Sequence, residues 1–122
     1  MSQCILVVDD EESIRELYEV EFKDAGYKVL CAVDGLHAVK IAEKEHIDLV
    51  VTDIKMPEGS GKTVALWFYT FQPKVPVVVV TAYPHYEDML MGEEKYAQAF
   101  FTKPVDMEKL KKTVADLLNK KH

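Results

Sequence analysis

Five polar side chains follow directly after short apolar runs in this 122-residue sequence. They are the acid pair Asp9 and Asp10, the acid Asp53, the hydroxyl of Thr81 and the ammonium of Lys103. Each has an ordinary explanation, because such residues also cap helices, start turns or pair with surface charges. Their repeated position after apolar runs instead suggests one shared site. Three carboxylates, a hydroxyl and a cation would then meet in one crevice.

Such a cluster has a definite chemistry. Carboxylates at about 4 Å repel by roughly 1 kcal/mol per pair in water, and by more where solvent is scarce. Mg²⁺ relieves that repulsion, since it prefers oxygen ligands and keeps room for a phosphate oxygen. A carboxylate beside it can be a nucleophile that forms an aspartyl phosphate. With Lys103 as a positive charge and Thr81 as a donor, the set predicts metal-assisted acceptance of a phosphoryl group on a carboxylate.

The elements that must position these residues alternate along the chain. Short, continuously apolar runs are typical of strands covered on both faces, and they predict strands at 4–8, 27–33, 47–52, 77–80 and 97–102. Helical spacing of apolar residues predicts helices at 13–25, 36–44, 62–71, 84–96 and 106–119, with Gly92 weakening the fourth. This βα alternation predicts an α/β fold, with a parallel sheet between two layers of helices. The carboxyl ends of parallel strands share one edge, so the five side chains should converge there.

Size and composition narrow the class of protein. The length predicts a single domain, 1–122, with no output domain after the last helix. A net charge of −6 argues against direct nucleic-acid binding. No apolar run reaches membrane-spanning length and no signal peptide opens the chain, so we expect no membrane association. Cys4 and Cys31 are expected to be offset along neighbouring strands and unpaired, which fits a cytoplasmic protein.

Four short motifs in order resemble the receiver domain of response regulators in two-component signalling, over essentially the whole chain. The matching stretches are Ile5–Glu11, Asp53–Pro57 followed by Gly61, Val80–Ala82 and Thr102–Pro104. The resemblance implies the flavodoxin-like, doubly wound (βα)5 receiver fold with strand order 2-1-3-4-5. It also implies a phosphorylation-activated switch rather than a conventional enzyme.

The resemblance assigns roles around the metal. It makes Asp53 the phosphoacceptor. It implies Mg²⁺ bound by Asp10, Asp53 and the backbone carbonyl of Lys55, with Asp9 acting through water. Lys103 falls on the lysine of the family's site. The bond between Lys103 and Pro104 is a candidate cis peptide.

The resemblance also implies a conformational switch. Thr81 would move toward the phosphoryl oxygens while Phe100 turns inward, and the surface of the fourth helix, fifth strand and fifth helix would change its affinity for a target. Lys55 and Tyr83 fall on positions that tune phosphate lifetime in the family. Because both are bulky, we expect them to shield the acyl phosphate and slow its hydrolysis.

The implied partners are a sensor histidine kinase or histidine phosphotransfer protein and a downstream target protein. A homodimer that depends on phosphorylation is a further candidate. Ile14 and Leu17, with Pro104 and Val105, surround the crevice and are candidates for docking a helical bundle. The alternative for Ile14 and Leu17 is that they belong to the core.

Three other classes compete with the switch. A flavodoxin-like electron carrier needs a phosphate-cradling loop after the first strand, but Asp9–Glu12 would repel phosphate. A receiver that only binds partners would not need the full set of Asp10, Asp53, Thr81 and Lys103. A Mg²⁺-dependent phosphatase usually has an acid two residues after its nucleophile, where this chain has Lys55.

Overall fold

The computed structural model describes residues 2–54 and 61–120. Its strands are β1 (Cys4–Val8), β2 (Lys28–Ala32), β3 (Leu49–Thr52), β4 (Val77–Thr81) and β5 (Ala99–Thr102). The α-helices are α1 (Glu12–Asp24), α2 (Gly35–Lys44), α3 (Gly61–Phe71), α4 (Glu87–Met91) and α5 (Met107–Asn119), and a 3₁₀ turn η1 (Pro84–Tyr86) precedes α4. All strand pairs are parallel, in the order β2-β1-β3-β4-β5. The expected fold class and strand order are confirmed.

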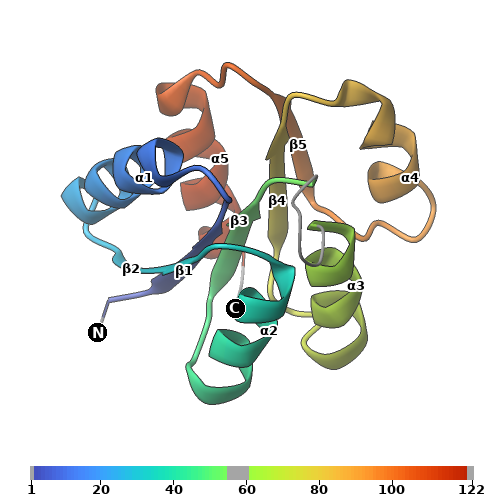
Figure 1. The fold of residues 1–122 in the computed structure, drawn as a ribbon, viewed down its shortest axis with the longest axis horizontal. Helices are drawn as coiled ribbons and strands as arrows, with labels where there is room; N and C mark the ends of the chain where they lie inside the picture. The colour runs from blue at the N-terminus through green and yellow to red at the C-terminus, as the bar shows by residue number, and fades with distance from the viewer. Residues whose placement is uncertain (1, 55–60, 121–122) are drawn as a thin grey trace.

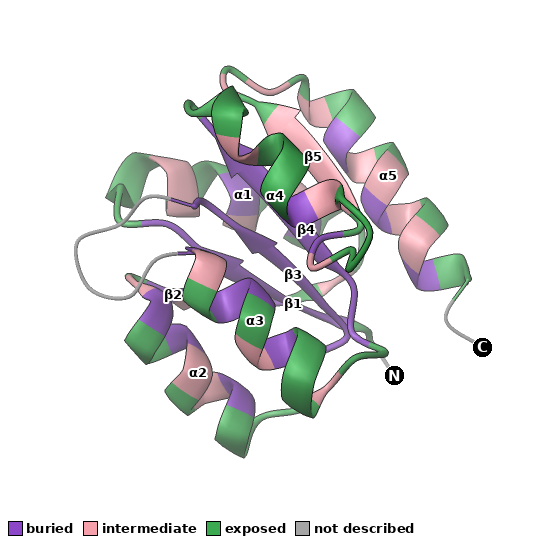
Figure 2. Cartoon of the chain, turned by 90° about the vertical axis from the view of Figure 1, so that its right-hand side faces the viewer, coloured by how far each residue is buried: buried purple, intermediate pink, exposed green. Residues whose placement is uncertain are grey.

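Helices cover both faces of this sheet (Figure 1). Alternate strand residues point to opposite faces. Leu6, Val50 and Val79 belong to a core cluster with α2, α3 and α4, which includes the buried Phe68. The intervening residues, such as Val7, belong to a second cluster with α1 and α5. Figure 2 shows β1, β3 and β4 buried along their length, which explains why their sequences are continuously apolar.

The fourth helix is much shorter than the predicted 84–96. It ends at Met91, and Gly92 is its C-cap. Lys95 then adopts a left-handed backbone with φ of 51°, and the amide of Ala97 donates to the carbonyl of Leu90 at 2.9 Å. The chain therefore turns back toward the sheet before β5. The prediction was wrong here because it continued the helix through Gly92, where the glycine ends it.

Other local expectations agree with the structure. The Lys103–Pro104 peptide is cis. Cys31 pairs in register with Val7, three residues beyond Cys4, and both cysteines are free. None of the helices in the described part of the chain has the length and apolar run that crossing a bilayer would require.

Candidate functional site: an acidic cluster at the strand ends

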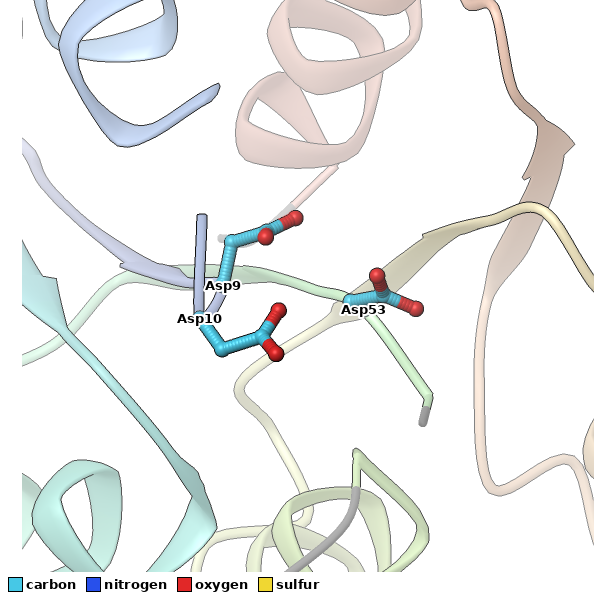
Figure 3. Close-up of side chains that lie close together, drawn as sticks. All are labelled: Asp9, Asp10 and Asp53. Carbon is cyan, nitrogen blue, oxygen red and sulfur yellow. The ribbon is translucent and has the colours of Figure 1, made fainter. Parts of the chain in front are cut away.

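The sheet register brings the polar strand-end residues to one edge. Val8 pairs with Thr52, so Asp9 and Asp53 follow adjacent strand ends. Their backbones are also linked, because the amide of Asp53 donates to the carbonyl of Val8 at 3.0 Å. Figure 3 shows Asp9, Asp10 and Asp53 gathered at the ends of β1 and β3. Parallel pairing of strands that are 40 or more residues apart in the sequence thus assembles the acids.

The three carboxylates form a compact set of oxygen ligands. One carboxylate oxygen from each of Asp9, Asp10 and Asp53 lies within 4.8 Å of the others. Asp9 and Asp53 are buried, with 2% and 7% of their surface exposed, whereas Asp10 is exposed. A hard divalent cation with oxygen ligands and several waters fits this donor set, because one side of the cluster is open to solvent. The residues present therefore fit Mg²⁺.

Lys103 joins the two buried acids. Its Nζ donates to Asp53 Oδ2 at 2.9 Å and to Asp9 Oδ2 at 3.1 Å, and it lies 3.8 Å from Glu11 Oε1. Burial lowers the pKa of Lys103, but the hydrogen bonds to Asp53 and Asp9 and the charges of both acids outweigh burial. The pKa of Lys103 is therefore raised above its ordinary value, and the side chain stays charged throughout the physiological range.

Backbone groups hold the same two acids in place. Asp9 Oδ1 accepts from the amide of Glu11 at 2.9 Å, and Asp53 Oδ1 accepts from the amide of Ile54 at 2.6 Å. Burial raises the pKa of Asp9 above its ordinary value, although the Glu11 amide and Lys103 act in the opposite direction. Each buried acid thus has one oxygen on a backbone amide and the other on Lys103. Their carboxylates have fixed orientations before any ligand binds.

Gly61 allows α3 to start against the site. Its amide donates to the carbonyl of Ile54 at 2.9 Å. A Cβ at this position would overlap the backbone carbonyl of Asp53 and lie 2.7 Å from the Cα of Ile54. Any larger residue would therefore displace the backbone that carries Asp53. Sequence reasoning noted Gly61 only as part of a motif, and the packing shows its physical role.

Thr81 and Phe100 lie on the neighbouring strands. Thr81 is fully buried at the end of β4, and its Oγ1 accepts from the amide of Tyr83 at 3.2 Å. Phe100 on β5 is partly buried and packs against the core cluster that contains α3 and α4. Both lie where the sequence placed them relative to the strand ends. Lys55, the remaining predicted site residue, is outside the described residues.

A groove of about 400 Å³ opens beside Lys103 between α1 and the segment after β5. Ile14, Leu17 and Tyr18 form its α1 side, and Pro104 and Val105 form the other. Leu17 is exposed and Ile14 is half-buried, so Leu17 is a surface residue rather than part of the core. Burial raises the pKa of the Tyr18 phenol to about 12, so the phenol stays neutral at the groove floor. The groove is apolar and adjoins the acidic cluster.

Two contacts on opposite faces of the sheet escaped the sequence analysis. Arg15 Nη1 donates to the carbonyl of Asp9 at 2.7 Å. On the opposite face, Tyr69 of α3 donates to Glu94 at 2.7 Å and packs against Tyr96, which holds the segment after α4. The Arg15 contact was missed because Arg15 lies six residues after Asp9, and the hydrophobic periodicity of the helix does not indicate which backbone group its side chain reaches. The Tyr69 contact depends on the shortened α4.

Comparison with known proteins agrees with this geometry. The family model for the response regulator receiver domain matches residues 5–115. The chain is 32% identical to sporulation initiation phosphotransferase F of Bacillus subtilis, over 97% of this chain and 95% of that protein. The structure of the response regulator TrrA from Thermotoga maritima, solved with Mg²⁺-BeF, is 36% identical with a TM-score of 0.86, covering 94% of this chain and 98% of that one. Chemotaxis protein CheY4 of Vibrio cholerae is 31% identical with a TM-score of 0.84, covering 96% and 99%.

The chain belongs to the response regulator receiver domain family. Such domains are signalling modules of two-component systems rather than conventional enzymes, and they receive phosphoryl groups from histidine kinases or phosphotransfer proteins. The chain spans only part of the transcriptional regulators that it also matches, 26% of GlrR from Escherichia coli and 50% of PhoP from Bacillus subtilis.

Proposed function

We propose that this receiver accepts a phosphoryl group from a phosphohistidine onto Asp53 in the presence of Mg²⁺, and then changes its affinity for a target protein. One observation supports the proposal above the others: the carboxylates of Asp9, Asp10 and Asp53 lie within 4.8 Å of one another, beside Lys103. That combination provides both a nucleophile and the positive charge that an approaching phosphoryl group needs.

The proposed transfer moves one phosphoryl group from a histidine nitrogen to a carboxylate oxygen. A carboxylate oxygen of Asp53 attacks phosphorus, the phosphorus–nitrogen bond of the phosphohistidine breaks, and its electron pair stays on the imidazole. Asp10, Asp53 and the backbone carbonyl of Lys55 would hold Mg²⁺, with Asp9 acting through water. The bound ion supplies positive charge that offsets repulsion between the carboxylates and the phosphoryl oxygens. Lys103, already 2.9 Å from Asp53, contributes a second positive charge.

Intact-mass spectrometry after incubation with acetyl phosphate and Mg²⁺ tests the transfer. We expect one added phosphate in the parent, none in Asp53→Asn and none in EDTA. Asp106→Asn is the matched control, because Asp106 is an exposed acid that caps α5 and should leave the adduct intact. If the parent binds Mg²⁺ but gains no phosphate, the chain is a receiver that only binds partners. An adduct that persists in Asp53→Asn would reassign the nucleophile.

Thr81 and Phe100 are proposed to carry the switch. In the present state Thr81 Oγ1 accepts the amide of Tyr83, and a move toward the phosphoryl group would break that bond. Phe100 lies on β5 next to α4, so a rotation of its ring would change the α4-β5-α5 surface. Thr81→Ala should retain phosphorylation on Asp53 yet lose the phosphorylation-dependent shifts of Phe100 resonances. If phosphorylation of Thr81→Ala moved the Phe100 resonances as far as it does in the parent, Thr81 would be excluded from the switch.

A slow loss of the phosphate is proposed from the bulk of Lys55 and Tyr83. The amide of Tyr83 donates to Thr81 Oγ1 at 3.2 Å and the residue is exposed, which supports this role. We expect Tyr83→Ala to shorten the half-life of the phosphorylated protein, measured by the decay of the mass adduct. A half-life of seconds for the parent would contradict the shielding role.

Partner binding completes the proposal. The apolar groove between α1 and Pro104 would dock the histidine-bearing helices of a kinase or phosphotransfer protein, while the α4-β5-α5 surface would bind a downstream target or a second phosphorylated copy. The net charge of −6 supports a protein target rather than direct nucleic-acid binding. We also propose that the protein is cytoplasmic and does not associate with a membrane.

A further inference from the structure

Asp9 and Asp10 are held very differently. The amide of Asp9 donates to the carbonyl of Ala32 at 3.2 Å, and its two carboxylate oxygens accept from Glu11 and Lys103. In the part of the chain that the structure describes, the carboxylate of Asp10 accepts no hydrogen bond, and the residue is exposed. Asp10 is nevertheless within the acidic cluster (Figure 3). The direction in which its side chain projects therefore depends on the orientation of the Asp10 backbone.

The side chain of Arg15 reaches that backbone. Arg15 is the fourth residue of α1, and its Nη1 donates to the carbonyl of Asp9 at 2.7 Å. This carbonyl and the amide of Asp10 belong to one planar peptide unit, so fixing one fixes the other. A short hydrogen bond from a charged donor is also among the stronger ones. Arg15 thus restrains the peptide from which the Asp10 side chain projects.

We propose that Arg15 is a positioning residue for the acidic site, orienting the Asp9–Asp10 peptide so that the Asp10 carboxylate faces Asp53. The proposal rests on the proposed function, since it assigns Arg15 a role in Mg²⁺ binding. Arg15 touches neither the ion nor the phosphoryl group in this role. Groups that orient metal ligands in this way commonly change metal affinity by tenfold or more.

The direction of the change in Mg²⁺ affinity distinguishes a positioning role of Arg15 from a purely electrostatic effect of its charge. Arg15 is a cation whose side chain contacts the backbone of the acidic cluster, so if its charge alone mattered, removing it would tighten Mg²⁺ binding. If it orients Asp10, removing it weakens Mg²⁺ binding because a ligand loses its fixed direction. The two explanations therefore predict opposite changes in the same dissociation constant.

The experiment compares Mg²⁺ dissociation constants by calorimetry in the parent, Arg15→Met, Arg15→Lys and Lys23→Met. We expect Arg15→Met to bind about tenfold more weakly, and Arg15→Lys to lie between it and the parent because lysine keeps the charge and one possible donor. Lys23→Met is the matched control, since it removes a cation from the same helix where the partner is Glu19. Thermal unfolding in EDTA checks that each variant is folded.

Equal or tighter binding in Arg15→Met would overturn the proposal. If the parent itself binds no Mg²⁺, the proposed function fails, and a metal-free measurement then decides the role of Arg15. The amide resonance of Asp10 should move in Arg15→Met and stay in place in Lys23→Met, because it reports the orientation of the same peptide. An unchanged Asp10 amide in Arg15→Met would overturn the positioning role independently of any metal.

Discussion

Two lysines in this receiver make similar contacts in different surroundings. Lys103 bridges Asp9 and Asp53 at the strand ends, with Nζ–O distances of 3.1 and 2.9 Å. Lys111 on α5 bridges Glu21 on α1 and Glu108 on its own helix, at 2.9 Å each. The acids differ in exposure: the side chains of Asp9 and Asp53 are 3% and 8% exposed, and those of Glu21 and Glu108 are 32% and 84% exposed.

This difference shows that distance alone does not identify a functional ion pair. Exposed pairs contribute little to stability, because water and salt screen them and long side chains lose freedom on pairing. Buried carboxylates have lost much of their hydration, so they depend on the cation between them. In the Lys103 cluster, the buried carboxylates repel one another, and a bound cation can reduce that repulsion. The Lys111 cluster instead joins two helices at the surface.

Removing the buried cation should have the largest effect. In EDTA we expect Lys103→Met to lower the free energy of unfolding by about 3 kcal/mol, since it leaves two buried carboxylates facing each other. Methionine keeps a similar length and apolar stem without the charge. Urea denaturation measures the change. A loss below about 1 kcal/mol would mean that solvent already screens Asp9 and Asp53.

Mg²⁺ should stabilise the folded chain by a smaller amount. At a free Mg²⁺ concentration ten times its dissociation constant, we expect about 1.4 kcal/mol in the parent. At the same Mg²⁺ concentration the gain should be larger in Lys103→Met, because two carboxylates that lack their cation should bind the ion more tightly. Urea denaturation at matched ionic strength, with Na⁺ in place of Mg²⁺ as the control, measures both gains. An equal effect of Na⁺ would argue against a specific site.

The pH dependence tests whether Lys103 stays charged. Its folded-state pKa is raised above the ordinary value of 10.5, so its contribution to stability is fully present below the unfolded pKa. That contribution is lost only as pH rises through the folded pKa. The stability difference between the parent and Lys103→Met should therefore be constant from about pH 7 to about pH 9. A difference that declines within this window would show that Lys103 titrates there.

The surface cluster should give the smallest effect. We expect Lys111→Met to leave the urea midpoint almost unchanged, because its partners Glu21 and Glu108 are 32% and 84% exposed and keep much of their hydration without it. Any small loss should vanish at about 1 M salt, where the Debye length is about 3 Å. A loss as large as that of Lys103→Met would show that exposure does not explain the difference between the two clusters.

The sequence by itself determined the architecture and the edge of the sheet where the site lies. Continuously apolar runs such as 4–8 and 77–80 require strands covered on both faces, and their alternation with helical segments requires a parallel sheet. Parallel strands place Asp9, Asp53 and Lys103 at one edge whatever the details of packing. These inferences succeeded because hydrophobic periodicity and the alternation of strands with helices can be recognised directly along the chain.

The tertiary structure decided how those residues interact. It shows that Lys103 bridges two buried acids, that Arg15 holds the Asp9 carbonyl, and that α4 ends at Met91. The residues of the Lys103 pairs stand 94 and 50 positions apart, so no local pattern records them. Burial, which separates the Lys103 cluster from the Lys111 cluster, arises only when helices and sheet pack together. The charged residues can therefore be identified in the sequence, but the strength of their interactions depends on the local dielectric, which only the folded chain determines.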